Sequence, residues 1–250
     1  MEKRKHTAKV SDDWHRKRYS EAVREARLAG DKEFQSWFSK SKGIHQTIVR
    51  GYWDLTFHIL TPKVCECMEK PEEKVALEIG YGGGRILNGA SSYFKQVFGI
   101  DIHDQQEKVE TFLRSQGKSN FKLIKTLGRT IDVESETIDF IYSFIVLQHL
   151  PSFSVYESYI KETYRCLKTG GVAQLYFGKY DKLSLIDRSR FFIPGYKEIT
   201  NARPNYTSLV IRVPKVKKLC RKVGFKIIDV GTSYKRAPDG YPKISGGQNY

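Results

Sequence analysis

The sequence predicts an α/β protein in which a doubly wound, mostly parallel sheet carries helices on both faces and follows an N-terminal helical extension. Between residues 75 and 178, five short apolar runs alternate with stretches that are compatible with helices. The runs are almost entirely apolar, which is typical of parallel strands buried on both faces. A glycine-rich turn follows the first run and an aspartate ends the second. Both features lie at the carboxyl ends of predicted strands, where such sheets bind ligands.

The part of the chain before the sheet, residues 1–73, is predicted to be helical. The sequence Ser-Asp-Asp at 11–13 can cap a helix that runs to about Ala29, and Gly30 ends it. Aromatic residues recur at helical spacing in this region, which favours packing into a core over contact with a ligand. Two further helices are expected over Lys32–Lys40 and over Gln46–Met68, the latter interrupted at Pro62.

The sheet region and the segments after it follow in order. Residues 179–206 lack a regular period, and a long irregular segment of this kind is typically functional. Val213–Val223 is predicted to be a helix, because Pro214 suits its first turn and Gly224 its end. The expected strands are 75–79, 96–102, 121–125, 138–144, 172–178 and a sixth at Phe225–Val230, and the expected helices within the sheet region lie near 85–94, 104–116 and 153–167.

Residues 77–84 read Leu-Glu-Ile-Gly-Tyr-Gly-Gly-Gly and lead from the first strand into a helix. The alternate glycines allow positive φ angles and remove Cβ atoms where a ligand must approach the backbone. The helix start supplies free N–H donors. A pyrophosphate-binding loop would have glycine at the position of Arg85. The carboxylate of Glu78 beside the loop favours a cationic cofactor, such as S-adenosylmethionine.

A second acid, Asp101, ends the apolar run at 96–102. It lies about twenty residues after the glycines, at the place where doubly wound folds hold a nucleotide ribose. A glycine-rich turn alone is often only a structural turn. The turn and the acid together favour a nucleotide-containing cofactor.

Residues 74–178 resemble the class I S-adenosylmethionine-dependent methyltransferases, in particular the group of ubiquinone-type and small-molecule methylases. The glycine loop, Asp101, the run 138–144 and the turn Leu167–Gly171 carry this resemblance. It implies a Rossmann-like core, S-adenosylmethionine as cofactor, and an antiparallel seventh strand that the chain would enter at Asn249-Tyr250. It also implies cofactor contacts by Glu78, Gly80, Tyr81, Gly82, Gly84, Asp101, Ile102, Leu127, Gly128, Ser143 and Phe144.

One departure from the family pattern concerns the adenine. Many relatives have an acid after the third strand, whereas this chain reads Lys-Thr-Leu-Gly-Arg at 125–129. Backbone groups around Leu127 and Gly128 would then contact the adenine. The resemblance divides the chain into a helical extension or lid (1–73), a cofactor-binding core (74–178), and a substrate-facing insertion with the C-terminal part of the same domain (179–250).

His149 is the candidate catalytic residue, since it follows the fourth strand, where the methyl group should face its acceptor. Methyl transfer depends mainly on positioning, and a base is needed only if the acceptor must lose a proton. An unperturbed histidine pKa of about 6.5 suits that role. The alternative is a packing or capping histidine before Pro151. Gln148 could orient the acceptor, and Arg50, Tyr52 and Trp53 of the extension could face the cleft.

Composition bounds the class of protein. Apolar residues make up 40% of the 250, which argues against global disorder. No apolar stretch reaches the ~20 residues of a membrane helix, and the first six residues lack a signal-peptide core. A cytoplasmic enzyme is therefore expected. Cys65 and Cys67 form the only close pair among four cysteines, and no histidines cluster near them, so neither a disulfide framework nor a metal site is expected.

Positive charge is concentrated after the fifth strand. Residues 181–250 carry 15 lysines and arginines against 5 acids, whereas 75–180 carry 12 against 11. Such a field attracts anionic substrates, nucleic acid or membrane surfaces, or it serves solubility alone. Arg188 and Arg190, with Arg203 and Arg212, are candidates for binding an anionic acceptor.

Three functions remain open on the sequence alone. We expect O-methylation of a small-molecule or glycan-precursor acceptor. A nucleic-acid methyltransferase is the alternative that the basic region suggests, although the fourth strand lacks an Asn/Asp-Pro-Pro-Tyr/Phe base-clamping motif. The third is a cofactor-binding scaffold without catalysis.

Overall fold

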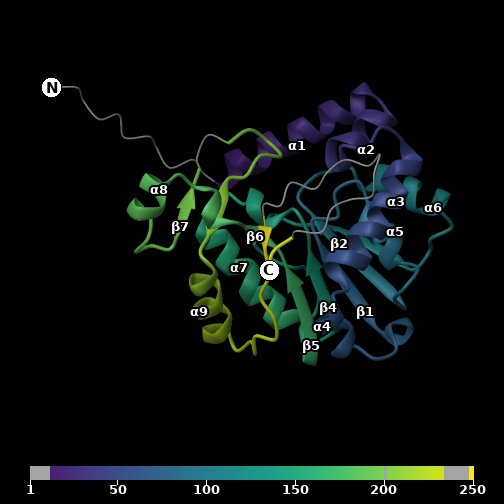
Figure 1. The fold of residues 1–250 in the computed structure, drawn as a ribbon. Coiled ribbons are helices and arrows are strands. Elements are labelled where there is room, and N and C mark those ends of the chain that lie inside the picture. Colours follow the sequence, from purple (N-terminus) through teal and green to yellow (C-terminus); the bar gives the residue numbers. More distant parts are fainter. Residues whose placement is uncertain (1–11, 200–201, 234–247) are drawn as a thin grey trace.

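The computed structural model describes residues 12–199, 202–233 and 248–250. Its centre is a sheet of five parallel strands in the order β3-β2-β1-β4-β5 (Figure 1). The strand order reverses between β1 and β4, which creates the crevice where such sheets bind ligands. The strands are β1 (Val75–Ile79), β2 (Gln96–Asp101), β3 (Phe121–Lys125), β4 (Ile138–Ser143) and β5 (Leu167–Leu175).

The five strands predicted between residues 75 and 178 are confirmed, and one of them begins earlier than expected. β5 begins at Leu167, five residues earlier than expected, and pairs there with Ile138. The next partners are Phe140 and Val172, so the intervening Lys168–Gly171 forms an irregularity in the ladder. Gly170 adopts a φ of 81° inside it, a conformation that glycine adopts without strain.

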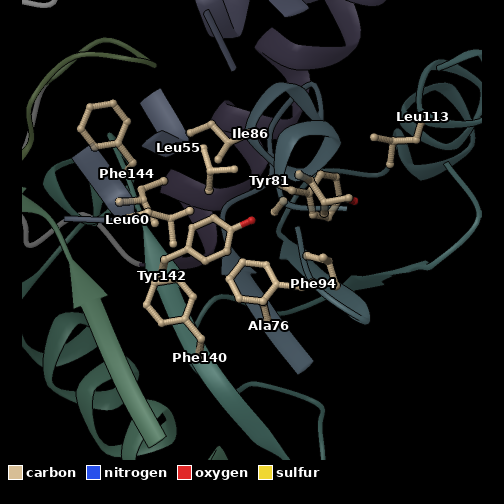
Figure 2. Packing of buried hydrophobic residues seen from close by; sticks show 14 of the residues in the cluster. Leu55, Leu60, Ala76, Tyr81, Ile86, Phe94, Leu113, Phe140, Tyr142 and Phe144 are labelled. Carbon is tan, nitrogen blue, oxygen red and sulfur yellow. The ribbon is translucent and has the colours of Figure 1, made fainter. Parts of the chain in front are cut away.

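Helices cover both faces of the sheet, and each face has its own apolar core. Alternation along β1 sends Ala76 to one face and Leu77 to the other. The first core also contains Phe140 and Tyr142, which pack under Leu55 and Ile86 (Figure 2). Helices α5 (Arg85–Ala90) and α6 (Gln106–Ser115) cover this face, and α7 (Phe153–Cys166) and α9 (Val213–Val223) cover the other.

The N-terminal extension folds as predicted over most of its length. Its helices are α1 (Asp12–Ala29), α2 (Asp31–Ser39), α3 (Ile44–Asp54) and α4 (Pro62–Glu66). The expected long third helix ends in a π-helical turn, η1 (Leu55–Ile59), and α4 starts at Pro62 with Thr61 as its N-cap. A cap at Ser11 lies outside the described residues. None of the helices in the described part of the chain has the length and apolar character needed to cross a bilayer.

The region after β5 contains more regular structure than the sequence indicated. It includes α8 (Leu185–Arg190) and an antiparallel hairpin of β7 (Tyr196–Glu198) and β8 (Leu209–Ile211). The helix at Val213–Val223 is confirmed as α9. Near the end, β9 (Gln248–Asn249) pairs antiparallel with β6 (Phe177–Gly178), where the seventh strand was expected.

The predicted sixth strand at Phe225–Val230 is wrong. No residue of this segment is in a strand, although most of its side chains are apolar. An apolar cavity lies between it and β5, lined by Val172, Leu175 and Ile228 among others. The segment lies beside the edge of β5 without joining the ladder, and the described sheet therefore ends at β5.

Candidate functional site

The glycine loop after β1 is held by hydrogen bonds from its main-chain N–H groups to residues of β2. Gly80 N donates to Ile100 O at 2.7 Å, and Gly82 N donates to the Asp101 carboxylate at 2.9 Å. Gly80 and Gly82 adopt φ angles of 77° and 53°, which other residues rarely adopt. The other Asp101 oxygen accepts from Ile102 N at 2.7 Å. Asp101 thus fixes the ends of β1 and β2 relative to each other.

A pocket opens at the carboxyl ends of the strands, beside Asp101. Its floor comes from the ends of β1 and β2, and its sides come from the loops after β3 and β4. Helix α1 covers it, and Arg16 of that helix donates to Leu127 O at 3.0 Å. The lining residues are Asp12, His15, Arg16, Tyr19, Ile79, Gly80, Ile100, Asp101, Ile102, Leu127, Gly128, Arg129, Ile145, Val146, His149, Leu150, Pro151, Val155 and Tyr159.

Side chains of this chain fill the space directly over the glycines. A Cβ atom at Gly82 would lie 2.7 Å from the Phe38 ring, and one at Gly83 would lie 2.8 Å from Gln35 Oε1. Both side chains come from α2, and Gln35 also donates to Gly83 O at 3.1 Å. Val146 packs on Gly80 in the same way. The loop is therefore pressed by protein side chains, and the open space lies on the Asp101 side.

Glu78 is part of a buried polar network behind the loop. It is 3% exposed and accepts a hydrogen bond from the Tyr142 hydroxyl at 3.1 Å. Burial raises the pKa of Glu78 to about 8, although the nearby Arg85 guanidinium opposes the shift. Arg85 forms an ion pair with Asp54 of α3. Glu78 does not line the pocket, so its carboxyl is not placed to face a bound cation there.

Four more of the predicted cofactor contacts lie behind the pocket wall. Tyr81 is 2% exposed and packs edge-on to His103 at 5.1 Å between ring centres. Ser143 donates to Ile79 O at 3.1 Å, and the Phe144 ring stacks on His58 at 4.8 Å. Gly84 packs on Val109 of α6, which a Cβ atom would approach to 2.7 Å. In this conformation these residues support the loop, whereas Gly80, Asp101, Ile102, Leu127 and Gly128 line the pocket.

His149 lines the pocket and belongs to a short 3₁₀ turn after β4, Leu147–His149. Its Nδ1 donates to Tyr206 O at 2.7 Å, which leaves Nε2 as the acceptor. Gln148 Nε2 lies 3.1 Å from it and donates to it. Burial lowers the pKa of His149 to about 4, so the imidazole is neutral at neutral pH.

None of the predicted substrate residues lines this pocket, and Gln148 approaches it only through its hydrogen bond to His149. The Tyr52 hydroxyl bonds to Ser92 at 2.8 Å, and the Trp53 ring packs on Phe57. The guanidinium of Arg190 lies over the Phe191 ring. Arg188, Arg203 and Arg212 are likewise missing from the pocket lining, and Arg50 is buried beside Asp54.

Sequence reasoning missed the residues that cover the site. Tyr19 of α1 and Phe38 of α2 join an aromatic cluster through Trp37, with ring centres 5.2 Å and 4.8 Å from it. Asn205, far along the chain, donates to Trp37 O at 2.7 Å. His103 Nε2 lies 3.0 Å from Gly82 O. The aromatic spacing of α2 was visible in the sequence, but nothing local showed that it faces the loop.

Comparisons with known proteins agree with this geometry. Residues 77–175 match the methyltransferase domain family, and the match covers the glycine loop, Asp101 and β4. Residues 77–175 therefore form a methyltransferase domain, and its fold is that of the class I S-adenosylmethionine-dependent enzymes. A search among curated proteins finds no match to this chain.

Solved structures share the fold of this methyltransferase at low sequence identity. An S-adenosylmethionine-dependent methyltransferase from Methanosarcina mazei is 21% identical, with a TM-score of 0.53 over 76% of this chain and 94% of that one. A phosphoethanolamine N-methyltransferase from Haemonchus contortus is 17% identical, with a TM-score of 0.56 over 90% of this chain and 46% of that one. The [4+2]-cyclase SpnF is 19% identical, with a TM-score of 0.52 over 69% and 58%.

The residues of the pocket fit the cofactor of this enzyme class at one end. Asp101 presents a carboxylate that ribose hydroxyls could donate to, and Ile102 and Leu127 present apolar surface beside it. The glycine loop could receive the amino-acid part of the cofactor only if Phe38 and Val146 move, because both side chains now lie against its glycines. Binding of the whole cofactor here would require α2 and the loop after β4 to adjust.

Proposed function

We propose that this methyltransferase methylates a hydroxyl group of a small-molecule or glycan-precursor acceptor. The observation that carries the proposal is that Asp101 and His149 line the same pocket. Helix α1 lies over it, and the segment around Tyr206 bonds to His149. A pocket covered in this way favours an acceptor smaller than a nucleic-acid duplex.

Each pocket residue has a role in this proposal. Asp101 binds the ribose, Ile102 flanks the adenine, and backbone groups of Leu127 and Gly128 bind its edge. A bound cofactor would supply an electrophilic methyl group on its sulfonium for transfer to the acceptor oxygen, with the neutral thioether as the leaving group. His149 accepts the hydroxyl proton at Nε2, since its Nδ1 already donates to Tyr206 O. Gln148 releases Nε2 and orients the acceptor.

The remaining predicted contacts have supporting roles. Glu78, Tyr81 and Gly84 shape the loop from behind, and Ser143 and Phe144 hold the end of β4. Arg188 and Arg190 would contact an anionic acceptor only if it extended beyond the pocket, because neither residue lines it.

A nucleic-acid acceptor is the second candidate, because residues 181–250 carry a net charge of +10. A duplex or single strand that contacts several phosphates would lose affinity by orders of magnitude between low and moderate salt. A small anionic acceptor would lose much less. A scaffold without turnover would bind the cofactor and methylate neither.

Cofactor binding is the first test. Titration calorimetry with S-adenosylmethionine and S-adenosylhomocysteine should show binding to the wild type, and Asp101→Ala should weaken it by about 1.5–3 kcal/mol, because ribose hydroxyls lose a charged acceptor. Asp104→Ala is the matched control, since Asp104 lies outside the pocket lining and pairs with Arg24. Equal affinity in all three proteins would exclude this site.

Turnover is the second test. Transfer of a labelled methyl group should be measured with hydroxylated small molecules, nucleotide sugars, RNA and DNA at two salt concentrations. Methylation of a small hydroxyl compound supports the proposal. Specific methylation of RNA or DNA would replace it with the second candidate, and cofactor binding without any product would favour the scaffold.

A further inference from the structure

The segment that contains α8 projects from the sheet domain (Figure 1). Leu185, Ile186 and Ile193 are 76%, 81% and 94% exposed, and Phe192 is 56% exposed. These four residues form what we call the apolar tip. Exposed apolar residues that occur singly are ordinary, whereas four within nine positions indicate a binding surface.

The apolar tip is held in place from below. The Tyr180 hydroxyl, in a side chain only 5% exposed, donates to Arg188 O at 2.8 Å. Arg212 donates to Phe192 O at 2.9 Å, and its guanidinium lies 3.7 Å from the centre of the Phe192 ring. The apolar side chains are therefore presented by a structured base that is joined to β8 and α9 through Arg212.

Basic residues surround the apolar tip in the sequence. Between residues 185 and 222 the chain has ten lysines and arginines and two acids. Both acids are engaged within the protein: Asp187 pairs with Lys197 at 2.8 Å, and Glu198 accepts from Phe153 N at 2.8 Å. The stretch carries a net charge of +8, so a surface that approaches the tip meets a positive field.

We propose that the apolar tip and its basic surroundings dock this protein onto an anionic membrane surface. Aliphatic side chains inserted at the headgroup boundary and cations attracted to anionic lipids are two signals that together give stable, reversible binding. Four side chains are few for a protein partner, because a standard interface uses about 20–30 residues a side. Three of the four side chains are aliphatic, and the Arg212 guanidinium lies over the Phe192 ring, so the tip is a poor platform for base stacking, which disfavours a single-stranded nucleic acid. The proposal does not depend on which acceptor the enzyme methylates.

Vesicle flotation tests the proposal. We expect the full chain to float with vesicles of phosphatidylcholine that contain phosphatidylserine, and not with phosphatidylcholine alone. The double variant Ile186→Ser with Ile193→Ser should bind at least about 10-fold less, because two inserted side chains are lost. Arg190→Gln should bind about 5-fold less, the effect of removing one cation near an anionic surface.

Matched controls lie on α1, away from the tip. Leu28 is 79% exposed and Arg27 is its exposed neighbour, so Leu28→Ser and Arg27→Gln should leave flotation unchanged. Every variant should keep the wild-type melting temperature and cofactor affinity, because none of these side chains lines the pocket. Those two readouts separate a failure of docking from a failure of the proposed function.

Three outcomes would overturn the proposal. The first is a wild-type protein that does not float with anionic vesicles. The second is equal flotation of the tip variant, which would show that charge alone binds lipid. In the third, the wild type does not float but forms a dimer or binds RNA, and the tip variant loses that binding. This result would assign the apolar tip to a protein or nucleic-acid partner.

Discussion

At the scale of single residues, the two acids that the sequence predicts to contact the cofactor differ in their access to the pocket. Asp101 accepts N–H groups from Gly82 and Ile102 and lines the pocket. Glu78 has the Tyr142 hydroxyl as its hydrogen-bond donor and is 3% exposed in the core. Burial raises its pKa to about 8, although the hydrogen bond from Tyr142 opposes the shift. One acid is available to a ligand, and the other belongs to the internal structure of the loop.

Glu78→Gln should make the protein less sensitive to rising pH. Glu78 has an ordinary pKa of 4.5 in the unfolded chain and of about 8 in the folded protein. The unfolded chain loses its proton first, so this group's contribution to stability is lost as pH rises from about 5 to about 8. The melting temperature of Glu78→Gln relative to wild type should therefore rise over that range and level off above it. The exposed Glu72→Gln should show no such trend, and a pH-independent difference for Glu78→Gln would contradict the expectation.

His149→Gln tests the proposed base. We expect kcat to fall by about 100-fold or more, the usual contribution of a general base, with cofactor affinity nearly unchanged. Because burial lowers the pKa of His149 to about 4, wild-type kcat should be flat from about pH 6 to 8 and decline only at lower pH. The exposed His45→Gln is the control. A wild-type inflection near pH 6.5, or full activity of His149→Gln, would remove His149 from the mechanism.

Close packing between α3 and α5 positions the glycine loop at the scale of elements. Gly51 lets α3 approach so closely that a Cβ atom there would lie 2.0 Å from Arg85 O. Arg85 is the first residue of α5, directly after the loop. The extension thus presses against the backbone that follows the loop, and its own helix α2 covers the loop from above.

Gly51→Ala should destabilise the protein although alanine is the better helix former. The added methyl group meets backbone that cannot rotate away, so we expect a loss of about 1–3 kcal/mol or more in the free energy of unfolding, as for other overpacked sites. Gly89→Ala is the matched control on the facing helix, because its Cβ would meet the mobile end of Leu55 at 3.2 Å. Urea unfolding measures both, and equal stability of the two variants would contradict the close approach.

Element prediction succeeded where the signal was local and failed where it was not. Strands β1 and β3 and the helices α1 and α9 follow the expected boundaries, because apolar period, caps and glycines specify them. The segment Phe225–Val230 has the residues of a strand, but it joins no sheet in the described part of the chain, and a cavity lies between it and β5. The role of Phe38 was missed because its contact with Gly82 joins residues that are distant in the sequence.

At the scale of the whole molecule, a buried cluster of charged side chains lies where the extension meets the sheet domain. Asp54 is fully buried on α3, and its carboxylate pairs with Arg85 of α5 and with Arg50 at 3.6 Å. Burial lowers the pKa of Arg50, against the attraction of Asp54. Two guanidinium groups thus share one carboxylate at the boundary between residues 1–73 and the core.

Asp54→Ala should loosen the extension from the sheet domain. Two buried guanidinium groups lose their shared carboxylate, and removal of one partner from a buried pair costs about 3–5 kcal/mol. Glu66→Ala, which breaks the exposed pair with Lys63, should change stability by at most about 1 kcal/mol. Thermal unfolding gives both values, and hydrogen exchange should show faster exchange in α1 to α3. Equal effects of the two substitutions would show that the buried pair has no special role.

The sequence by itself determined the order of strands and helices, the glycine loop and the acid that ends β2. These features depend on side-chain period, on positive φ angles and on spacing, all of which are local properties. Only the tertiary structure decided that Asp101 lines the pocket and Glu78 does not, that α2 covers the loop, and that His149 donates to Tyr206 O. It also decided that Ile193 is exposed. Burial and hydrogen bonding depend on which distant segments meet, and no local pattern specifies those contacts.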